Sequence, residues 1–335
     1  MNKDDLIVIG GAGGFIAGAL AKYFRDSGFT RIRAIDKKPL TEWYRATPGV
    51  ENLCLDLSRE ENCRAACRDA FEVYNLAADM GGMGFIESFR VECLRSVLIN
   101  THMIEAAYQA GAQRYFFSSS ACAYNTELQK DPDCRALKES DAYPAMAERG
   151  YGWEKLISEM FCQEYWAERG LKTAIARFHN VYGPFGTWDG GREKAPAAIC
   201  RKVAEAKDTG SGLIEIWGDG SQTRSFMYID DCTKGIDLIM HCEDLVATPI
   251  NLGSSELVSI NRLVDLVEEI AGLKLERRYD LDAPRGVGGR NSDNTFIRGV
   301  LDWEPNTPLR AGLETTYEWI ERQYLDRKAG KKTLI

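Results

Sequence analysis

The chain has 335 residues, of which 44% are hydrophobic and 27% charged, and its formal net charge is −8 at pH 7. This length can bury the core of one α/β unit with an appended lobe, and the acidic balance argues against non-specific binding to nucleic acid or anionic membranes. No apolar run approaches the about 20 residues that span a bilayer, and no signal peptide is expected. Ten cysteines without a paired C-x-x-C spacing, and three histidines, predict no metal site and favour the reducing cytoplasm.

The first predicted element is a buried strand, because residues 6–10 form an apolar, β-branched run. A helical pattern to about Ser27 follows, with Gly11, Gly14 and Ala17 at a G-x-x-G-x-x-A spacing. Glycines allow a tight turn and let a pyrophosphate approach the helix N-terminus, while a small third residue lets the helix pack against the strand. The pattern predicts a dinucleotide site, and the alternative is a structural turn that binds no ligand.

A second strand over residues 31–35 leads into Asp36. An acidic residue about 20 residues past the glycines would hold a ribose 2′-hydroxyl and repel a 2′-phosphate. The expected cofactor is therefore NAD rather than NADP, a preference that Lys37 and Lys38 weaken slightly.

Strands and helices then alternate. Strands are expected near residues 50–54, 71–75, 114–117 and 173–177, and helices near residues 59–69, 93–110 and 151–168. This order predicts an α/β fold with a Rossmann-type, doubly wound parallel sheet and right-handed crossovers.

The alternation changes beyond Arg177, where a Gly/Pro-rich stretch precedes a helix. We expect a smaller C-terminal α/β substrate lobe here, with one return of the chain to the first domain. The expected division is 1–177 with 225–251 for the NAD-binding domain, 178–224 with 252–325 for the lobe, and 326–335 for a polar tail.

Tyr151 and Lys155 are four residues apart and share one face of a predicted helix. The Lys155 ammonium can lower the tyrosine pKa from about 10, which prepares Tyr151 to take a hydroxyl proton while a nicotinamide takes hydride from the same carbon. Cys122 and Lys194 are a second candidate proton-transfer pair, in which Lys194 and the nicotinamide would favour the thiolate. The alternatives are an inert core cysteine and a solvated lysine.

Six segments of the chain carry a resemblance to a known family. They are residues 75–85, 119–122, 177–188, 190–198, 217–226 and 289–294. Through them the chain, from residue 5 to about 325, resembles the extended short-chain dehydrogenases/reductases of the NAD-dependent epimerase/dehydratase family, and more narrowly the GDP-mannose 3,5-epimerases. Residues 80–85 and 190–198 are the most particular to these epimerases.

The resemblance implies a reaction on a GDP-sugar. Tyr151 would remove the 4-hydroxyl proton of GDP-α-D-mannose while the carbon 4 hydride passes to NAD. The resulting ketone acidifies carbons 3 and 5, where Cys122 would act as base and Lys194 as acid. Return of the hydride would give GDP-L-galactose, with GDP-L-gulose as a possible second product.

The resemblance also implies the site residues. The catalytic set is Tyr151, Lys155, Cys122, Lys194 and Ser120; the NAD set is Gly11, Gly14, Phe15, Ile16, Asp36, Asp56, Tyr151 and Lys155. The substrate set is Gly81, Ser120, Ala121, Cys122, Asn180, Glu193, Lys194, Ala195, Lys202, Gln222, Arg224 and Arg290, with Arg285 as a weaker candidate. His179 is a candidate acid or base, and the alternative is that it is a buried structural residue. Extended family members pair two helices between subunits, so the helices at residues 93–110 and 151–168 imply a homodimer.

Three other functions stay open. A nucleotide-sugar 4-epimerase would share the fold, NAD and Tyr151 but needs neither Cys122 nor Lys194. A 4,6-dehydratase would want an Asp-Glu pair after the catalytic serine, where this chain has Ala121-Cys122-Ala123. A non-catalytic, NAD-sensing regulatory protein could have lost Tyr151 or Lys155, and their joint presence with Ser120 argues against it.

Overall fold

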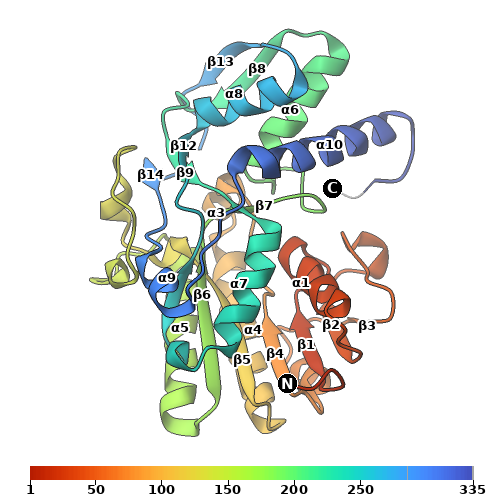
Figure 1. Cartoon of the computed structure of the whole chain (residues 1–335), viewed down its shortest axis with the longest axis vertical. Coiled ribbons are helices and arrows are strands. Elements are labelled where there is room, and N and C mark those ends of the chain that lie inside the picture. The colour runs from red at the N-terminus through yellow and green to blue at the C-terminus, as the bar shows by residue number, and fades with distance from the viewer. Residues whose placement is uncertain (285, 334–335) are drawn as a thin grey trace.

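The computed structural model describes residues 1–284 and 286–333 (Figure 1). Its largest unit is a sheet of seven parallel strands in the order β11-β6-β5-β4-β1-β2-β3. The strands are β1 (Ile7–Gly10), β2 (Ile32–Asp36), β3 (Glu51–Cys54), β4 (Glu72–Asn75), β5 (Arg114–Ser120), β6 (Lys172–Phe178) and β11 (Pro249–Leu252). The predicted doubly wound sheet is confirmed.

Helices cover both faces of this sheet, which explains why the strands read as continuous apolar runs. Ile7 and Ile9 of β1 face one core, and the intervening Val8 faces the other. The first face is covered by α1 (Phe15–Asp26) and α7 (Ile229–His241), the second by α2 (Glu60–Cys67), α4 (Arg90–Gln109) and α5 (Tyr151–Arg169). The segment after residue 225 thus returns to the large sheet through α7 and β11.

The strand order reverses between β1 and β4, because the chain moves outward from β1 to β2 and β3 and then restarts at β4 on the other side. At such a switch point the loops that follow two neighbouring strands separate and leave a crevice at the carboxyl ends. The glycine turn after β1 and residues 76–80 after β4 border this crevice.

A second lobe lies above the carboxyl ends of the strands (Figure 1). It consists of α6 (Ala195–Thr209), α8 (Ile260–Ala271), α10 (Leu309–Lys328) and the parallel pair β8 (Leu213–Trp217) and β13 (Glu276–Asp280). Helix α10 continues through Lys328, three residues into the segment expected to be a tail. Ion pairs of Arg327 with Asp189 and of Lys328 with Asp208 hold that end.

Short elements connect the two lobes. They are α3 (Met83–Ser88), α9 (Thr295–Leu301), the three-stranded sheet β12 (Leu257–Ser259), β9 (Thr223–Ser225) and β14 (Gly289–Arg290), and the pair β7 (Val181–Tyr182) and β10 (Met227–Tyr228). Strand β14 carries Arg290 toward the first domain, and this placement matters for the site below.

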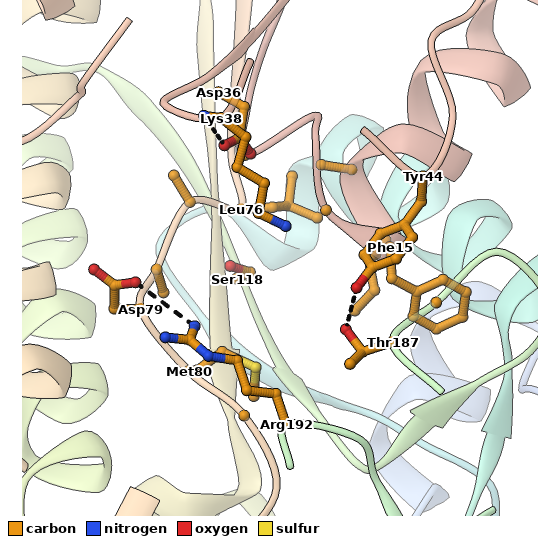
Figure 2. Close-up of a pocket in the computed structure, with 18 of the residues that line it drawn as sticks. Phe15, Asp36, Lys38, Tyr44, Leu76, Asp79, Met80, Ser118, Thr187 and Arg192 are labelled. Atoms are coloured by element: carbon orange, nitrogen blue, oxygen red, sulfur yellow. Dashed lines mark hydrogen bonds and ion pairs between the residues drawn. The ribbon is translucent and has the colours of Figure 1, made fainter. Parts of the chain in front are cut away.

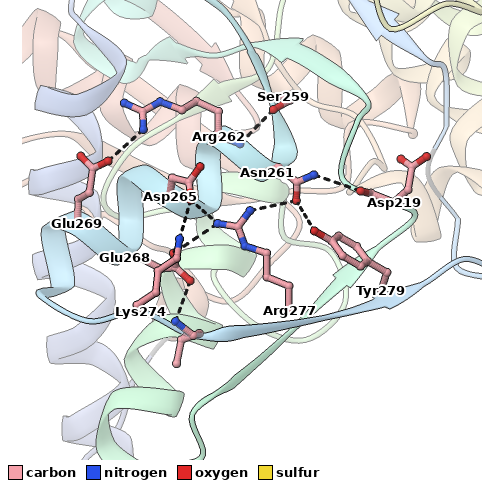
Figure 3. Close-up of polar contacts among 11 residues, drawn as sticks. Asp219, Ser259, Asn261, Arg262, Asp265, Glu268, Glu269, Lys274, Arg277 and Tyr279 are labelled. Carbon is pink, nitrogen blue, oxygen red and sulfur yellow. Dashed lines mark hydrogen bonds and ion pairs between the residues drawn. The ribbon is translucent and has the colours of Figure 1, made fainter.

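Within the second lobe, polar contacts tie α8 to β13 (Figure 3). The buried Glu268 accepts from Lys274 Nζ at 2.6 Å and from the backbone N–H of Leu275 at 3.1 Å. Arg277 from β13 pairs with Asp265 and Glu268. A buried carboxylate with several donors is satisfied, so this network orients the strand on the helix.

Among the helices of residues 1–284 and 286–333, none is long and apolar enough to cross a membrane.

Candidate active site

A cleft of about 1030 Å³ opens at the carboxyl ends of the strands, between the sheet and the second lobe. Figure 2 shows part of its wall, where Tyr44 and Thr187 are joined by a 2.6 Å hydrogen bond and Arg192 faces Asp79 at 3.9 Å. The predicted residues in its wall are Gly11, Gly14, Phe15, Ile16, Asp36, Asp56, Gly81, Ser120, Tyr151, Lys155, Asn180, Glu193 and Lys194. Most of the predicted site therefore meets in one cavity.

One end of the cleft fits a dinucleotide. Gly11 has φ +84°, a conformation that favours glycine, and a Cβ there would lie 2.9 Å from the backbone of Ala77. Gly14 caps α1 in an extended conformation, and its own N–H bonds to Gly11 O at 2.9 Å, so the N-terminus of α1 faces the cleft. Backbone N–H groups at a helix N-terminus are suited to a pyrophosphate.

Asp36 stands at the far side of this turn, at the end of β2. Its carboxylate accepts from the backbone N–H of Gly13 at 3.1 Å and of Lys38 at 3.0 Å. These contacts hold the carboxylate at the cleft wall, where a ribose hydroxyl can be bound (Figure 2). The glycine turn, the helix N-terminus and this carboxylate together fit NAD.

Tyr151 begins α5 at the other end of the cleft, beside the end of β5. The residue after it must be glycine, because a Cβ on Gly152 would lie 2.2 Å from the backbone oxygen of Cys122. Lys155, buried one turn later, places Nζ 5.4 Å from the centre of the Tyr151 ring and 3.5 Å from Glu154. Ser120 hydrogen-bonds the tyrosine side chain, so the three groups face one point of the cleft.

The net shift of the Tyr151 pKa in the protein alone is upward, opposite to the lowering that was expected. Burial raises the pKa of the Tyr151 phenol well above its usual value, and the nearby Cys122 and Glu154 raise it further. The hydrogen bond from Ser120 acts in the opposite direction. The free-energy cost of removing water from the phenolate is larger than the stabilisation that the neighbouring hydrogen-bond donor provides.

Cys122 lies at the centre of a buried charged cluster. Arg290 Nη1 donates to Cys122 Sγ at 3.3 Å, and Arg290 Nη2 lies 3.3 Å from Glu148 Oε1. Arg290 Nε donates to Gln129 Oε1 at 2.6 Å. Lys194 is close enough for Cys122, Arg290 and Glu148 to affect its pKa. The predicted pair Cys122 and Lys194 is thus brought together, with two partners that the sequence did not indicate.

The predicted coupling of Cys122 with Lys194 is present, but burial and not this coupling sets the direction of both pKa shifts. Burial raises the pKa of the Cys122 thiol, and the Glu148 carboxylate raises it further, while the cation that lowers it is Arg290. Burial likewise lowers the pKa of Lys194, with Cys122 opposing that shift. Both shifts favour the neutral thiol of Cys122 and the neutral amine of Lys194 over their charged forms.

The remaining substrate candidates lie outside the cleft wall. Lys202 Nζ donates to Glu215 O at 2.8 Å, Gln222 Nε2 to Trp217 O at 2.8 Å, and Arg224 Nη2 to Val287 O at 2.6 Å. Ala121, Cys122, Ala195 and Arg290 are likewise not among the lining residues of the part of the chain that is described. Arg285 lies outside the described residues.

His179 has the environment of a structural residue. It is fully buried, its Nε2 lies 2.8 Å from Asn251 Oδ1, and burial lowers its pKa to about 3. The adjacent Asn180 lines the cleft and donates to Ser225 O at 3.1 Å. A histidine that stays neutral near pH 7 can hold the turn but carries no proton to give.

Sequence reasoning missed Glu148 and Gln129. Glu148 precedes Tyr151 by three residues in an irregular loop, and Gln129 lies in a short 3₁₀ turn. Neither residue belongs to a motif or a periodic pattern, so only their contacts with Arg290 reveal them.

Comparisons with known proteins find relatives along almost the whole chain. GDP-mannose 3,5-epimerase of Arabidopsis thaliana is 42% identical over 330 residues, covering 96% of this chain and 84% of the relative. GDP-mannose 3,5-epimerase 1 of Oryza sativa subsp. indica is 41% identical over 95% of this chain and 82% of the relative. Among solved structures, UDP-glucose 4-epimerase of Thermotoga maritima superposes with a TM-score of 0.82 at 22% identity, over 94% of this chain and 98% of that one.

A further solved structure, MoeE5 in complex with UDP-glucose and NAD, superposes with a TM-score of 0.77 at 28% identity, over 95% of this chain and 99% of that one. The NAD dependent epimerase/dehydratase family matches residues 7–253. The chain is a member of the NAD dependent epimerase/dehydratase family, and its cofactor is NAD.

Proposed function

We propose that the protein is an enzyme that converts GDP-α-D-mannose to GDP-L-galactose by epimerisation at carbons 3 and 5, with GDP-L-gulose as the product of inversion at carbon 5 alone. The observation that carries this proposal is the presence of two proton-transfer pairs, one in the wall of the NAD cleft and one that joins Lys194 of that wall to the buried Cys122. Tyr151 with Lys155 forms the first pair and Cys122 with Lys194 the second. The relatives that are 41–42% identical to this chain bear the same activity in their names.

The first pair acts at carbon 4. NAD, when bound, supplies the acceptor for the carbon 4 hydride and the source of its return. Tyr151 takes the proton of the 4-hydroxyl group, and Ser120 holds that hydroxyl by a hydrogen bond. Lys155, buried at one helical turn from Tyr151, stabilises the phenolate by its charge.

The second pair acts at carbons 3 and 5, whose protons become acidic once carbon 4 is a ketone. Cys122 removes a proton from one side of the ring, and Lys194 delivers a proton to the other side, which inverts the centre. Arg290 stabilises the thiolate through its 3.3 Å contact with Cys122 Sγ.

The GDP diphosphate is assigned to cations of the connecting elements and the second lobe. Lys202, Arg224 and Arg290 are the candidates, because guanidinium and ammonium groups suit phosphate oxygens in an otherwise acidic chain.

Larger-scale assignments follow from the same proposal. Residues 1–177 with 225–251 are assigned to NAD, and residues 178–224 with 252–325 to the nucleotide sugar; the packing of α7 and β11 on the large sheet supports this division. A cytoplasmic location is favoured because all ten cysteines are free thiols.

A homodimer is proposed from the exposed faces of α4 and α5. Val91, Leu94 and Leu98 are exposed at helical spacing on α4, and Ile157 and Met160 are exposed on the adjacent α5. An unpartnered apolar face made of two packed helices suits a second copy of the same face, related by twofold symmetry.

The test of the reaction is incubation of the enzyme with GDP-mannose in deuterated water, followed by NMR. The proposal expects deuterium at carbons 3 and 5 and the signals of GDP-L-galactose, with no net consumption of NAD. Label absent from both carbons, with inversion at carbon 4, would instead identify a 4-epimerase.

A further inference from the structure

Cys122 does not line the large cleft, although its proposed partner Lys194 does. Lys194 and Tyr151 both line the large cleft, whereas Cys122, which is as buried as Tyr151, lines neither of two cavities found in the described part of the chain. The second of these cavities, of about 550 Å³, lies among α3, the loop around Gln129 and residues 286–288. Its wall includes Glu148.

Glu148 joins the thiol to this second cavity. Its backbone N–H donates to the backbone oxygen of Cys122 at 3.1 Å, and its carboxylate is close enough to raise the thiol pKa. One carboxylate oxygen, Oε1, accepts from Arg290 at 3.3 Å. The other, Oε2, is buried and has no hydrogen-bond partner among the described residues. A buried acceptor left without a donor is costly, so this oxygen calls for an explanation.

The proposed reaction requires an acceptor for the proton that Cys122 takes from the sugar, and a carboxylate oxygen can be that acceptor. In each inversion a carbon proton moves to Cys122 Sγ, and a different proton leaves Lys194. After each inversion Lys194 can regain a proton from water in the large cleft, because it lines that cleft. Cys122 must lose its proton before it can act again, and the cleft is filled by substrate while it acts.

We propose that Glu148 is a positioning residue for Cys122 and carries its proton to the water of the second cavity. In this step the Sγ–H bond breaks and a bond from the proton to the Glu148 carboxylate forms, which leaves a thiolate and a neutral carboxylic acid. The acid then releases the proton to water in the cavity and returns to the carboxylate. This inference rests on the proposed function, since it needs Cys122 to be the base.

The ionisable groups around the thiol include one that also borders the second cavity. The ionisable groups that face it are Tyr151 from α5, Arg290 from β14, Lys194 before α6 and Glu148 from its loop, with Cys93 of α4 in the same buried cluster. Of these, Glu148 is both an anion and a residue of the second cavity wall. Arg290, which touches both partners, keeps a positive charge beside the thiolate after the proton has left.

The test compares Glu148→Gln with wild type under two regimes in deuterated water. With enzyme in excess over GDP-mannose, the first of the two inversions needs no return of the Cys122 proton, so deuterium should enter the first carbon at a rate within about twofold of wild type. With substrate in excess, kcat should fall by about tenfold or more, since removal of a proton-transfer group costs about 10²–10⁴-fold at most. Acetate, a small carboxylate that can enter the cavity, should restore kcat in proportion to its concentration.

Glu87→Gln is the matched control, because Glu87 is exposed in the wall of the same cavity and its loss changes charge equally. It should leave kcat unchanged. The inference is overturned if Glu148→Gln leaves kcat unaltered, or if the first inversion and kcat slow equally and acetate has no effect. If wild type itself introduces no label, the proposed function fails rather than the relay.

A second variant covers the case in which Glu148→Gln does not fold. Thr126→Trp places a large ring in the second cavity while Glu148 is kept. The relay predicts a lower kcat with an unchanged rate of the first inversion, and an unchanged kcat would overturn it.

Discussion

Tyr151 is the residue on which the whole reaction depends, because carbon 4 must be oxidised before carbons 3 and 5 can exchange. Tyr151→Phe removes the phenol oxygen and keeps the ring in its buried place. We expect a loss of kcat of about 10²–10⁴-fold or more with near-normal NAD binding. NMR of the products and measurement of retained NAD check this, with the exposed Tyr143→Phe as control. Full epimerase activity in Tyr151→Phe would refute the assigned proton transfer.

Cys122 and Lys194 separate this function from that of a 4-epimerase. Cys122→Ala should still bind GDP-mannose and pass hydride to NAD, seen as weak NADH absorbance, but lose deuterium exchange at both carbons. Lys194→Ala should keep part of the exchange and lose inversion, because the thiolate can return a solvent proton to the same side. Rate losses below about tenfold in both variants, with label at both carbons, would show that other groups act.

His241 offers a stability prediction with a defined sign. Hydrogen bonds to Asp237 and to the buried Glu72 raise its pKa to about 10, above the about 6.5 of an unfolded histidine. The stabilisation is therefore complete below about pH 6.5 and is lost as the pH rises through about 10. His241→Gln should lower the free energy of unfolding by about 1 kcal/mol near pH 6, since the ring is partly exposed. Urea denaturation should show no difference above pH 10, and a constant difference would contradict this.

At the scale of elements, the contact of α8 with β13 depends on one buried carboxylate. Glu268 receives Lys274, Arg277 and the Leu275 N–H, and Glu268→Gln keeps its shape while removing its charge (Figure 3). We expect the free energy of unfolding to fall by about 1.5–3 kcal/mol, the range for hydrogen bonds to charged groups. Urea denaturation with the exposed Glu276→Gln as control checks this, and equal stability of the two variants would refute it.

At the scale of the whole molecule, the proposed dimer can be tested on its apolar face. Leu98→Glu places a charge on the exposed face of α4 and should yield monomers at micromolar concentration, because burying an unpaired carboxylate is costly. Leu325→Glu on α10 is the matched control, since Leu325 is similarly exposed and lies outside that face. Sedimentation measurements read the result, and a monomeric wild type with full activity would contradict the dimer.

The amino-acid sequence by itself determined the sheet, the glycine turn and the helix that carries Tyr151 and Lys155. Each of these depends on short-range spacing: an apolar run bounded by glycines, an acidic residue after the second strand, and two residues one helical turn apart. The observed bounds of β1 and α5 differ from the predicted ones by a single residue at one end.

Only the tertiary structure decided the electrostatics of the site. Arg290 reaches Cys122 across 168 positions of the chain, and Glu148 reaches Arg290 across 142. The pKa directions predicted for Tyr151 and Cys122 were wrong for the same reason. The spacing of residues reports which charges can be neighbours, but the loss of water around them depends on packing by segments from the whole chain.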